Sequence, residues 1–285
     1  MSIDQSPALV GRVGELVLEY KRGGERTICT HAYARSPWHH VPPMYLDDTG
    51  AACTFLLNPG GGLVGGDEVA VNVRLHVDAH VIISTPSANR VYRSMGQAST
   101  QCVNLHVGPH AVLEWVPEVT IPFAGSRFRQ TIRAQVDHGG ILLLWDAFAS
   151  GRVARDERWS FTSLENEISV TVDSGMSLVE RSRVLPPART QPAELAQAWN
   201  YVASFYMVGC GVPAEVWKRM ETGMVALLDD RPGVILGGVS EPPVPGLVVK
   251  VLARQAPDLA STFEGLWSIA RRELWNLPVP ALRRY

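Results

Sequence analysis

Short runs of alternating apolar and polar residues fill roughly the first two thirds of this chain. Runs of this kind, rich in β-branched residues and bounded by Gly, Pro, Asp and Asn, are typical of β-strands. They lie at Gly14–Tyr20, Ala52–Leu57, Glu68–Val77, Val81–Thr85, Gln101–Val107, Val112–Trp115, Arg129–Val136, Ile141–Trp145 and Ile168–Val172. The pattern predicts a β-rich body over about residues 1–185.

The spacing of apolar residues changes to a helical period after Pro186 and Pro187. Three helices are predicted on this basis, at Ala193–Val208, Pro213–Leu228 and Pro257–Trp275. Leu247–Leu252 has a strand pattern, whereas Leu236–Val244 is rich in Gly and Pro and is predicted to be a loop. We therefore expect one domain over residues 1–285, with the helical portion at about 190–285.

A weak internal repeat of about 30 residues occurs within the β-rich part, where Leu75–His80 matches Leu105–His110. Repeats of this length favour stacked supersecondary units, as in a β-solenoid, although hairpins in any β protein share similar turns. Stacking in the register of the repeat would place His76 over His106, at the strand spacing of about 4.8 Å. Such histidines would bind a divalent ion or form a polar ladder. The predicted fold class is mainly β, with stacked strands resembling a β-solenoid or layered sheets.

The composition is that of a globular protein in a reducing compartment. Of 285 residues, 46% are hydrophobic and 19% are charged, which argues against disorder. The net charge of −2 gives no reason to expect nucleic acid or an anionic membrane as a partner. No apolar run approaches the roughly 18 residues that span a bilayer, and no secretory signal is visible. The four cysteines lie far apart, so we expect a cytoplasmic protein without a zinc knuckle or dithiol site.

A glycine cluster at Gly60–Gly66 is the most unusual local feature. Glycine reaches positive φ readily, so the cluster predicts a tight turn. It lacks the Lys-Ser/Thr of a phosphate loop, and a strand pattern follows it where a dinucleotide site needs a helix. Asp67 and Glu68 come next and would point to opposite faces of a strand, unless the backbone is still turning there. The alternative is that one acid caps the turn and the other is solvated.

Two further acids border apolar strands, Asp146 after Ile141–Trp145 and Glu180 within Leu178–Arg181. A carboxylate in such a place needs an ion pair, hydrogen bonds or a bound cation. Arg152 and Arg181 are available for structural ion pairs.

Several segments of the chain resemble the urease accessory protein D family, which is also called H. The resemblance is carried, in order, by NPGGGLVGGD (58–67), STPSANRVYRS (84–94) and LEWVPEVTIPFAGSRF (113–128). Leu178–Val184 and the segment from Val248 to Arg284 resemble later blocks of the family, so nearly the whole chain is covered. The resemblance implies a β-rich, non-enzymatic factor that takes part in urease maturation.

The resemblance also implies partners and a metal path. Such a protein joins accessory proteins F and G on the subunits of apo-urease and offers an internal path for nickel, with no tightly bound cofactor. The acids implied to line the path are Asp67, Glu68, Asp146 and Glu180. The matching motif residues are Gly61, Gly62, Gly65, Gly66, Asn89, Tyr92 and Arg93. A path of carboxylates, carbonyls and water holds first-row ions less firmly than thiolate or multi-histidine sites, which suits transient nickel.

The C-terminal helix is expected to dock accessory protein F through Trp267, Arg271 and Trp275, because Trp and Arg often dominate interface energy. The alternative for Trp267 is packing in the chain's own core.

Two other functions are compatible with the sequence. One is a β-solenoid carbohydrate-active enzyme using Asp67, Glu68 or Asp146, which would need two carboxylates about 5–9.5 Å apart across a cleft. The other is an adaptor with no metal role.

Overall fold

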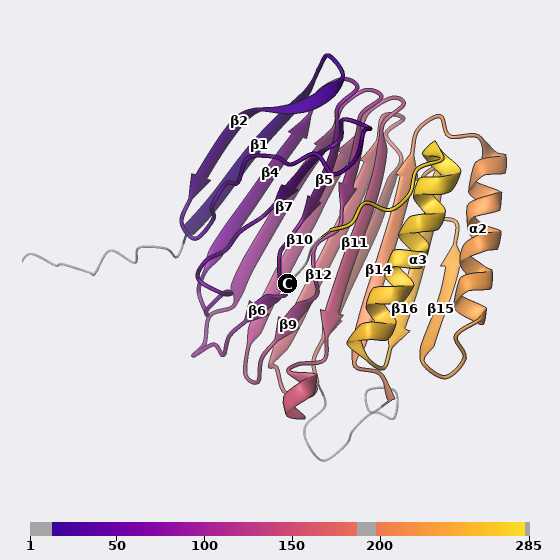
Figure 1. Cartoon of the computed structure of the whole chain (residues 1–285). Helices are drawn as coiled ribbons and strands as arrows, with labels where there is room; N and C mark the ends of the chain where they lie inside the picture. Colours follow the sequence, from indigo (N-terminus) through magenta and orange to yellow (C-terminus); the bar gives the residue numbers. More distant parts are fainter. Residues whose placement is uncertain (1–12, 187–197, 283–285) are drawn as a thin grey trace, which may run out of the picture.

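Two β-sheets lie face to face, and two helices cover the outer face of one of them (Figure 1). The structure is a computed structural model that describes residues 13–186 and 198–282. The prediction of a mainly β protein with stacked strands is confirmed. The assignment of residues 1–285 to one domain stays a prediction.

The first sheet has the strand order β13-β12-β10-β7-β4-β1-β2. Its strands are β1 (Val13–Gly23), β2 (Arg26–Arg35), β4 (Glu68–Leu75), β7 (Ser99–Val107), β10 (Arg127–Val136), β12 (Ser163–Val172) and β13 (Ser177–Val184). The five strands from β1 to β12 pair in parallel, whereas β2 and β13 pair antiparallel at the two edges.

The second sheet has the strand order β15-β16-β14-β11-β8-β5-β3. Its strands are β3 (Ala52–Phe55), β5 (His80–Ser84), β8 (Val112–Trp115), β11 (Ile141–Ala149), β14 (Tyr201–Gly209), β15 (Ile235–Ser240) and β16 (Gly246–Ala253). Two short strands, β6 (Asn89–Val91) and β9 (Thr120–Pro122), pair beside β11, and a 3-10 turn, η1, follows at Val153–Arg155.

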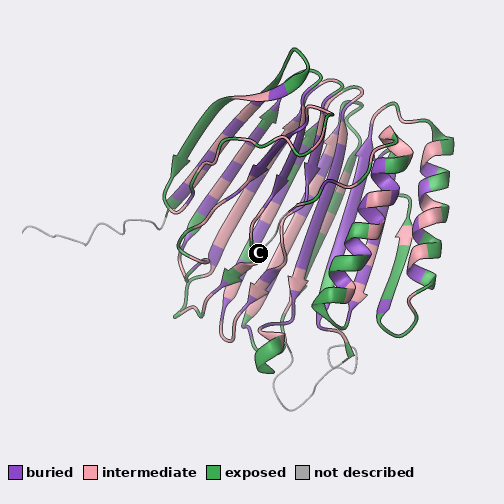
Figure 2. Ribbon diagram, in the orientation of Figure 1, coloured by how far each residue is buried: buried purple, intermediate pink, exposed green. Residues whose placement is uncertain are grey.

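Successive coils of the chain alternate between the two sheets. β4 leads to β5, β7 to β8, and β10 to β11, and each strand pairs in parallel with its counterpart in the next coil. This is the β-solenoid arrangement that the repeat favoured. Alternating residues of the inner strands of the first sheet face the second sheet; in β4 they are Val69, Val71, Val73 and Leu75, all buried (Figure 2).

The helices α2 (Ala214–Asp229) and α3 (Ala256–Trp275) confirm two of the three predicted helices. Their apolar faces form a second core with the outer face of the second sheet. Its centre is aromatic, since Phe263 lies with its ring centroid 4.5 Å from that of Trp145 and 5.9 Å from that of Phe205. Within the described ranges, no helix combines the length and apolar character needed to cross a membrane.

The sequence pattern misassigned two segments after Pro187. Part of the predicted helix Ala193–Val208 lies outside the described residues, and the rest falls in strand β14. β14 is central in its sheet and buried on both faces, so its unbroken apolar run satisfies a helical period as well as a strand. The predicted loop Leu236–Val244 overlaps β15, an exposed edge strand in which two glycines obscured the strand pattern.

The predicted histidine ladder is wrong. Strand pairing places Leu75 opposite Val107, and His106 therefore lies opposite Arg74. The paired residues Leu75 and Val107 are 32 positions apart, whereas the repeat matches residues 30 positions apart, so the strands do not pair in the register of the repeat. The His106 Nε2 atom instead lies 2.9 Å from an Asp137 carboxylate oxygen. In the described part of the chain, no three His, Cys, Asp or Glu side chains are grouped so that they could hold a metal ion.

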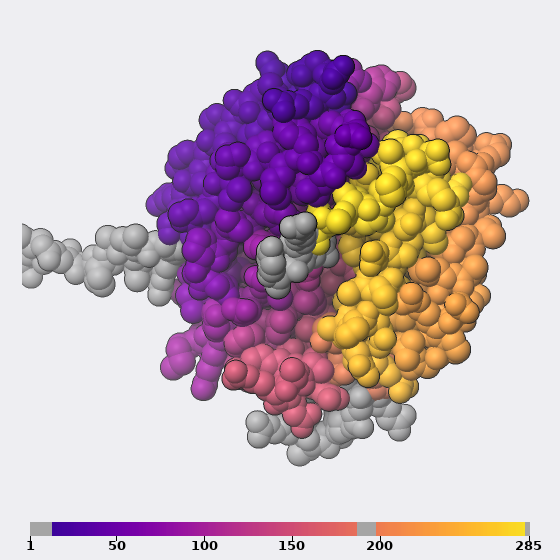
Figure 3. Space-filling view, viewed as in Figure 1, coloured from indigo at the N-terminus to yellow at the C-terminus, as the bar shows by residue number. Residues whose placement is uncertain are grey.

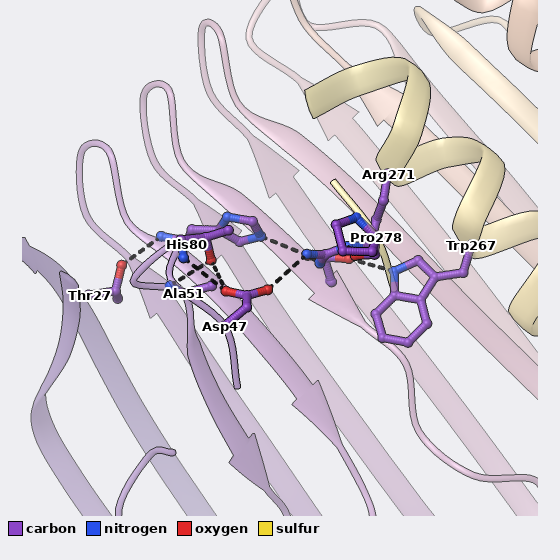
Figure 4. A network of polar contacts seen from close by, with 9 residues as sticks. Thr27, Asp47, Ala51, His80, Trp267, Arg271 and Pro278 are labelled. Carbon is purple, nitrogen blue, oxygen red and sulfur yellow. Dashed lines mark hydrogen bonds and ion pairs between the residues drawn. The ribbon is translucent and has the colours of Figure 1, made fainter. Parts of the chain in front are cut away.

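A buried ion pair joins α3 to the second sheet (Figure 4). Glu114 on β8 and Arg271 on α3 are both completely buried and contact each other directly. Glu114 also accepts a hydrogen bond from Trp267 Nε1 and lies 2.7 Å from His80 Nε2. Burial opposes the charge of Glu114, but hydrogen bonding to His80, together with the charges of His80 and Arg271, outweighs burial and lowers the pKa of Glu114.

The segment after α3 reaches back to the N-terminal part of the structure. Arg271 Nε donates to the Pro278 carbonyl oxygen at 2.7 Å, and its Nη2 lies 3.4 Å from Asp47 Oδ2. Figure 3 shows this C-terminal segment, in yellow, lying against the N-terminal part of the surface. Trp267 and Arg271 are both buried in the chain's own core, which for Trp267 is the alternative stated from the sequence. Their part in docking accessory protein F stays a prediction. Trp275 is half-buried, with its ring 5.4 Å from that of His80.

Replacing Arg271 by Met should lower the free energy of unfolding by about 3–5 kcal/mol, because Glu114 would be left buried without its cation. Chemical denaturation followed by circular dichroism measures this change. The matched control is Arg219→Met, since Arg219 is 57% exposed and its pair with Glu273 should contribute about 0–1 kcal/mol. Equal losses in the two variants would contradict the anchoring role of Arg271.

Candidate functional site

The glycine loop and strand β6 form one packed unit. Leu63 N–H donates to the Arg90 carbonyl oxygen, and Tyr92 N–H donates to the Leu63 carbonyl oxygen, each at 2.8 Å. At Gly62, φ is 153° and a Cβ would collide with the Arg90 carbonyl oxygen. Gly65 is similarly constrained, because its Cβ would lie 2.9 Å from the Cβ of Ser94. The two most specific sequence motifs are therefore coupled by close backbone packing.

The remaining motif residues support this unit. The Tyr92 hydroxyl donates to the Gly61 carbonyl oxygen at 3.3 Å, and Gly66 takes a φ of 89°. The Arg93 side chain packs against Gly125. Asn89 N–H donates to the Val119 carbonyl oxygen at 3.0 Å, which joins β6 to the segment before β9.

Asp67 closes the glycine turn. Its Oδ2 accepts a hydrogen bond from Val64 N–H at 2.8 Å, and its own N–H donates to the Val64 carbonyl oxygen at 3.0 Å. Asp67 is 7% exposed, whereas Glu68 begins β4 on the opposite, exposed face. The two acids therefore do not line one cavity, and Asp67 has the turn-capping contacts of the structural alternative.

Asp146 is the carboxylate at the centre of the inter-sheet space. It lies on β11, is 7% exposed, and accepts hydrogen bonds from Gln130 Nε2 at 2.8 Å and Asn166 Nδ2 at 2.7 Å. Gln130 also accepts a hydrogen bond from Gln101 at 3.1 Å. These amides come from consecutive strands of the first sheet, where strand pairing sets them side by side.

Burial raises the pKa of Asp146 to about 6. The hydrogen bonds from Gln130 and Asn166 and the charge of Lys250 act in the opposite direction, while the charge of Glu180 adds to the rise. Asp146 therefore changes its charge close to neutral pH, in contrast to an ordinary exposed aspartate.

A cavity of about 370 Å³ connects the glycine loop with Asp146. Its lining includes Gly61 and Gly62 on one side and Gln101, Gln130 and Asp146 on the other. Trp38 and Asn89 also line it, and both have a buried N–H group without a partner among the described residues. Of the four predicted path acids, Asp146 alone lines this cavity; Glu118 lines it too and was missed from the sequence.

Glu180 on β13 is paired with a lysine. Its carboxylate contacts Lys250 Nζ directly and accepts a hydrogen bond from the Tyr206 hydroxyl at 2.8 Å. Lys250 Nζ also donates to Ser204 Oγ at 2.8 Å. Burial, reinforced by the charge of Glu180, raises the pKa of Tyr206. Arg181, which the sequence offered as an ion-pair partner for these acids, pairs instead with Glu167 on the outer face of the first sheet.

Strand pairing connects these two groups. Asp146 lies opposite Ser204, and Ser204 lies opposite Lys250, so all three occupy one rung of the second sheet. Eight polar side chains in this space each hydrogen-bond to another of the set, and we call them together the inter-sheet polar row. They are Gln101, Gln130, Asp146, Asn166, Ser204, Tyr206, Lys250 and Glu180. The row contains Asp146 and Glu180, whereas Asp67 and Glu68, the other two acids that the resemblance implied, lie outside it.

Replacing Asp146 by Asn should stabilise the chain more at pH 7 than at pH 5, by about 1 kcal/mol. The folded-state pKa of Asp146, about 6, lies above the ordinary value for an aspartate, so wild-type stability falls as pH rises from the ordinary pKa to the folded-state pKa. Urea unfolding of both proteins at several pH values measures the difference in their free energies of unfolding. The contributions of the other titrating groups cancel in this difference, because both proteins carry them. A difference that stays constant from pH 5 to pH 8 would contradict the raised pKa.

Comparison with known proteins places the chain in a family. A sequence model of the UreD urease accessory protein family matches residues 12–285. The chain is similar to urease accessory protein UreD of Mycolicibacterium gilvum, at 31% identity over 266 residues that cover 93% of this chain and 94% of that protein. UreD of Alkalilimnicola ehrlichii is 31% identical over 281 residues, covering 96% and 91% of the two chains. The chain belongs to the UreD urease accessory protein family, and it is a non-catalytic maturation factor in assembly of the nickel centre of urease.

Proposed function

We propose that the chain passes nickel ions through its interior to apo-urease, along the inter-sheet polar row. The observation that supports this most directly is Asp146, a buried carboxylate that lines the cavity beneath the glycine loop. Its two hydrogen-bond donors are neutral amides, so its charge has no cationic partner in direct contact among the described residues. A divalent ion entering the cavity would meet an oxygen ligand already held in place.

The ligand chemistry suits transfer better than storage. Carboxylate, amide and hydroxyl oxygens bind first-row ions less firmly than thiolate or imidazole groups. The amides of Gln130 and Asn166 also stabilise the ionised form of Asp146 when no metal is present, so the row need not collapse after an ion leaves.

Glu180 has a different role in this proposal. Lys250 already neutralises its carboxylate, so an ion reaching Glu180 must displace the ammonium group. The Lys250 side chain is 44% exposed and that of Glu180 is 36% exposed, which places this pair at a wetter end of the row than Asp146. We assign Asp146 to the interior of the path and Glu180 to its far end.

The partners in this proposal are accessory proteins F and G and the subunits of apo-urease, with nickel carried transiently. Trp275, which remains half-buried beside α3, is retained as a contact residue for accessory protein F. The other candidate, an adaptor without a metal role, uses the same partners and differs only in the function of the polar row.

Asp146→Asn should reduce urease activation by about tenfold when the chain is co-expressed with urease and the other accessory proteins, because the cavity would lose its charge. Urease activity and nickel content of the purified urease are the measurements. Glu68→Gln is the matched control, since it makes the same chemical change on an exposed outer face. Full activation by Asp146→Asn, with the complex intact, would favour the adaptor.

Two variants of Asp67 distinguish a role in the geometry of the glycine turn from a role of its charge. Asp67→Asn keeps an oxygen that can accept from Val64 N–H, whereas Asp67→Ala removes it. Because the observed contacts are those of a turn residue, we expect Asp67→Asn to activate urease nearly normally and Asp67→Ala to lose stability by about 1 kcal/mol and to activate less. Equal loss of activation in both variants, with both folded, would assign the Asp67 charge to the nickel path.

A further inference from the structure

Five arginines gather at the end of the sandwich that carries β6, β9 and η1. Arg90, Arg152 and Arg155 line one depression of about 490 Å³. Arg158 and Arg254 line a second depression of about the same volume, and the two share Val153, Ala154 and Tyr201 in their linings. We call this continuous surface the arginine groove. None of its described lining residues is an aspartate or a glutamate.

The arginine groove differs from the other arginine sites of this protein. Arg129, Arg181 and Arg183 each pair with a glutamate on the outer face of the first sheet. In the groove, Arg152 pairs with Glu157 at one margin, and Arg158 lies 3.5 Å from the highly exposed Asp156.

Three groove arginines form no direct ion pair among the described residues: Arg90, Arg155 and Arg254, although the charge of Arg155 acts on Glu157. They stand out as local positive charge on a chain whose net charge is −2.

The groove also has an aromatic base. The Arg152 guanidinium lies over the Phe123 ring at 4.5 Å, and that ring packs edge-on against Tyr92 at 5.1 Å. Arg254 lies over Trp199 at 5.3 Å. Guanidinium groups supported on rings are held in place while their N–H groups stay available, and planar guanidinium matches the two oxygens of a carboxylate.

We propose that the arginine groove binds an acidic segment of a partner protein. Charge complementarity supports this occupant, because the five guanidinium groups of the groove face only two carboxylates of the described residues, Glu157 and Asp156. Nucleic acid is disfavoured by the net charge and by the position of Tyr201, which is 9% exposed and cannot stack on a base.

The groove adjoins the mouth of the interior cavity. Arg90 directly follows Asn89, which lines that cavity, and Arg90 Nη1 lies 3.9 Å from the Cβ position of Gly61. Unneutralised guanidinium groups repel a free divalent cation at this mouth. A docked acidic segment would cancel the repulsion and present oxygen ligands. This consequence for nickel rests on the proposed function, whereas the binding of the segment does not.

The test uses the purified full chain and a fluorescein-labelled peptide of eight glutamates, with anisotropy measured at 50 and 300 mM NaCl. We expect saturable binding that weakens at the higher salt. The double variant Arg155→Ser, Arg254→Ser should weaken it at least tenfold. Arg129→Ser with Arg183→Ser is the control of equal charge change and should alter binding less than twofold. Circular dichroism checks that both variants are folded.

Three outcomes would overturn the proposal. They are absence of binding to the wild-type chain, equal weakening by both double variants, and tighter binding of a single-stranded oligonucleotide that the groove variant abolishes. In co-expression, the groove variant should also reduce urease activation; normal activation with lost peptide binding would reject a role in partner docking. Because the peptide assay contains no nickel, its failure leaves the proposed nickel path to be decided by the Asp146 variant.

Discussion

The register of the parallel strands is the constraint on which the interior depends. Side chains alternate in direction along a strand, so a shift of one residue would turn every inward side chain outward. In the observed register the amides of Gln101, Gln130 and Asn166 lie side by side across three strands, and those of Gln130 and Asn166 donate to Asp146 on the facing sheet. The apolar residues above and below this rung fix the register, and the register in turn places the polar groups.

A polar row between two sheets is costly unless its hydrogen bonds are satisfied. The row meets this condition through amide contacts at Asp146 and an ion pair at Glu180, while the surrounding core stays apolar. On the other side of the second sheet, the Glu114–Arg271 pair and the aromatic contacts of Phe263 hold the helices in place. The helices thus cover the outer face of the second sheet, and the inter-sheet polar row lies on its inner face.

The sequence predicted the strand-rich body, α2, α3 and the glycine turn, because period, proline and glycine signals are local. It did not predict β14, where burial on both faces removes the alternation, or the offset between coils, which strand pairing sets two residues away from the sequence match. Asp146 was noticed because it follows an apolar strand, and the family resemblance implied its role in a metal path. Lys250 could not be assigned to Glu180, because residues 70 positions apart meet only through tertiary pairing.

Charge along the interior alternates in a way that bears on nickel transfer. The arginine groove is positive beside the cavity mouth, Asp146 provides a carboxylate inside it, and Lys250 provides an ammonium group beyond. On the proposed path, a divalent ion entering from water would meet repulsion at the groove and, beyond Asp146, an ammonium group that is already paired with Glu180. Entry would then require a change at the groove, and a protein partner that brings carboxylates can supply it. In the proposed path, this arrangement would hold back free ions until a partner is docked, which is a property that a tight metal site could not provide.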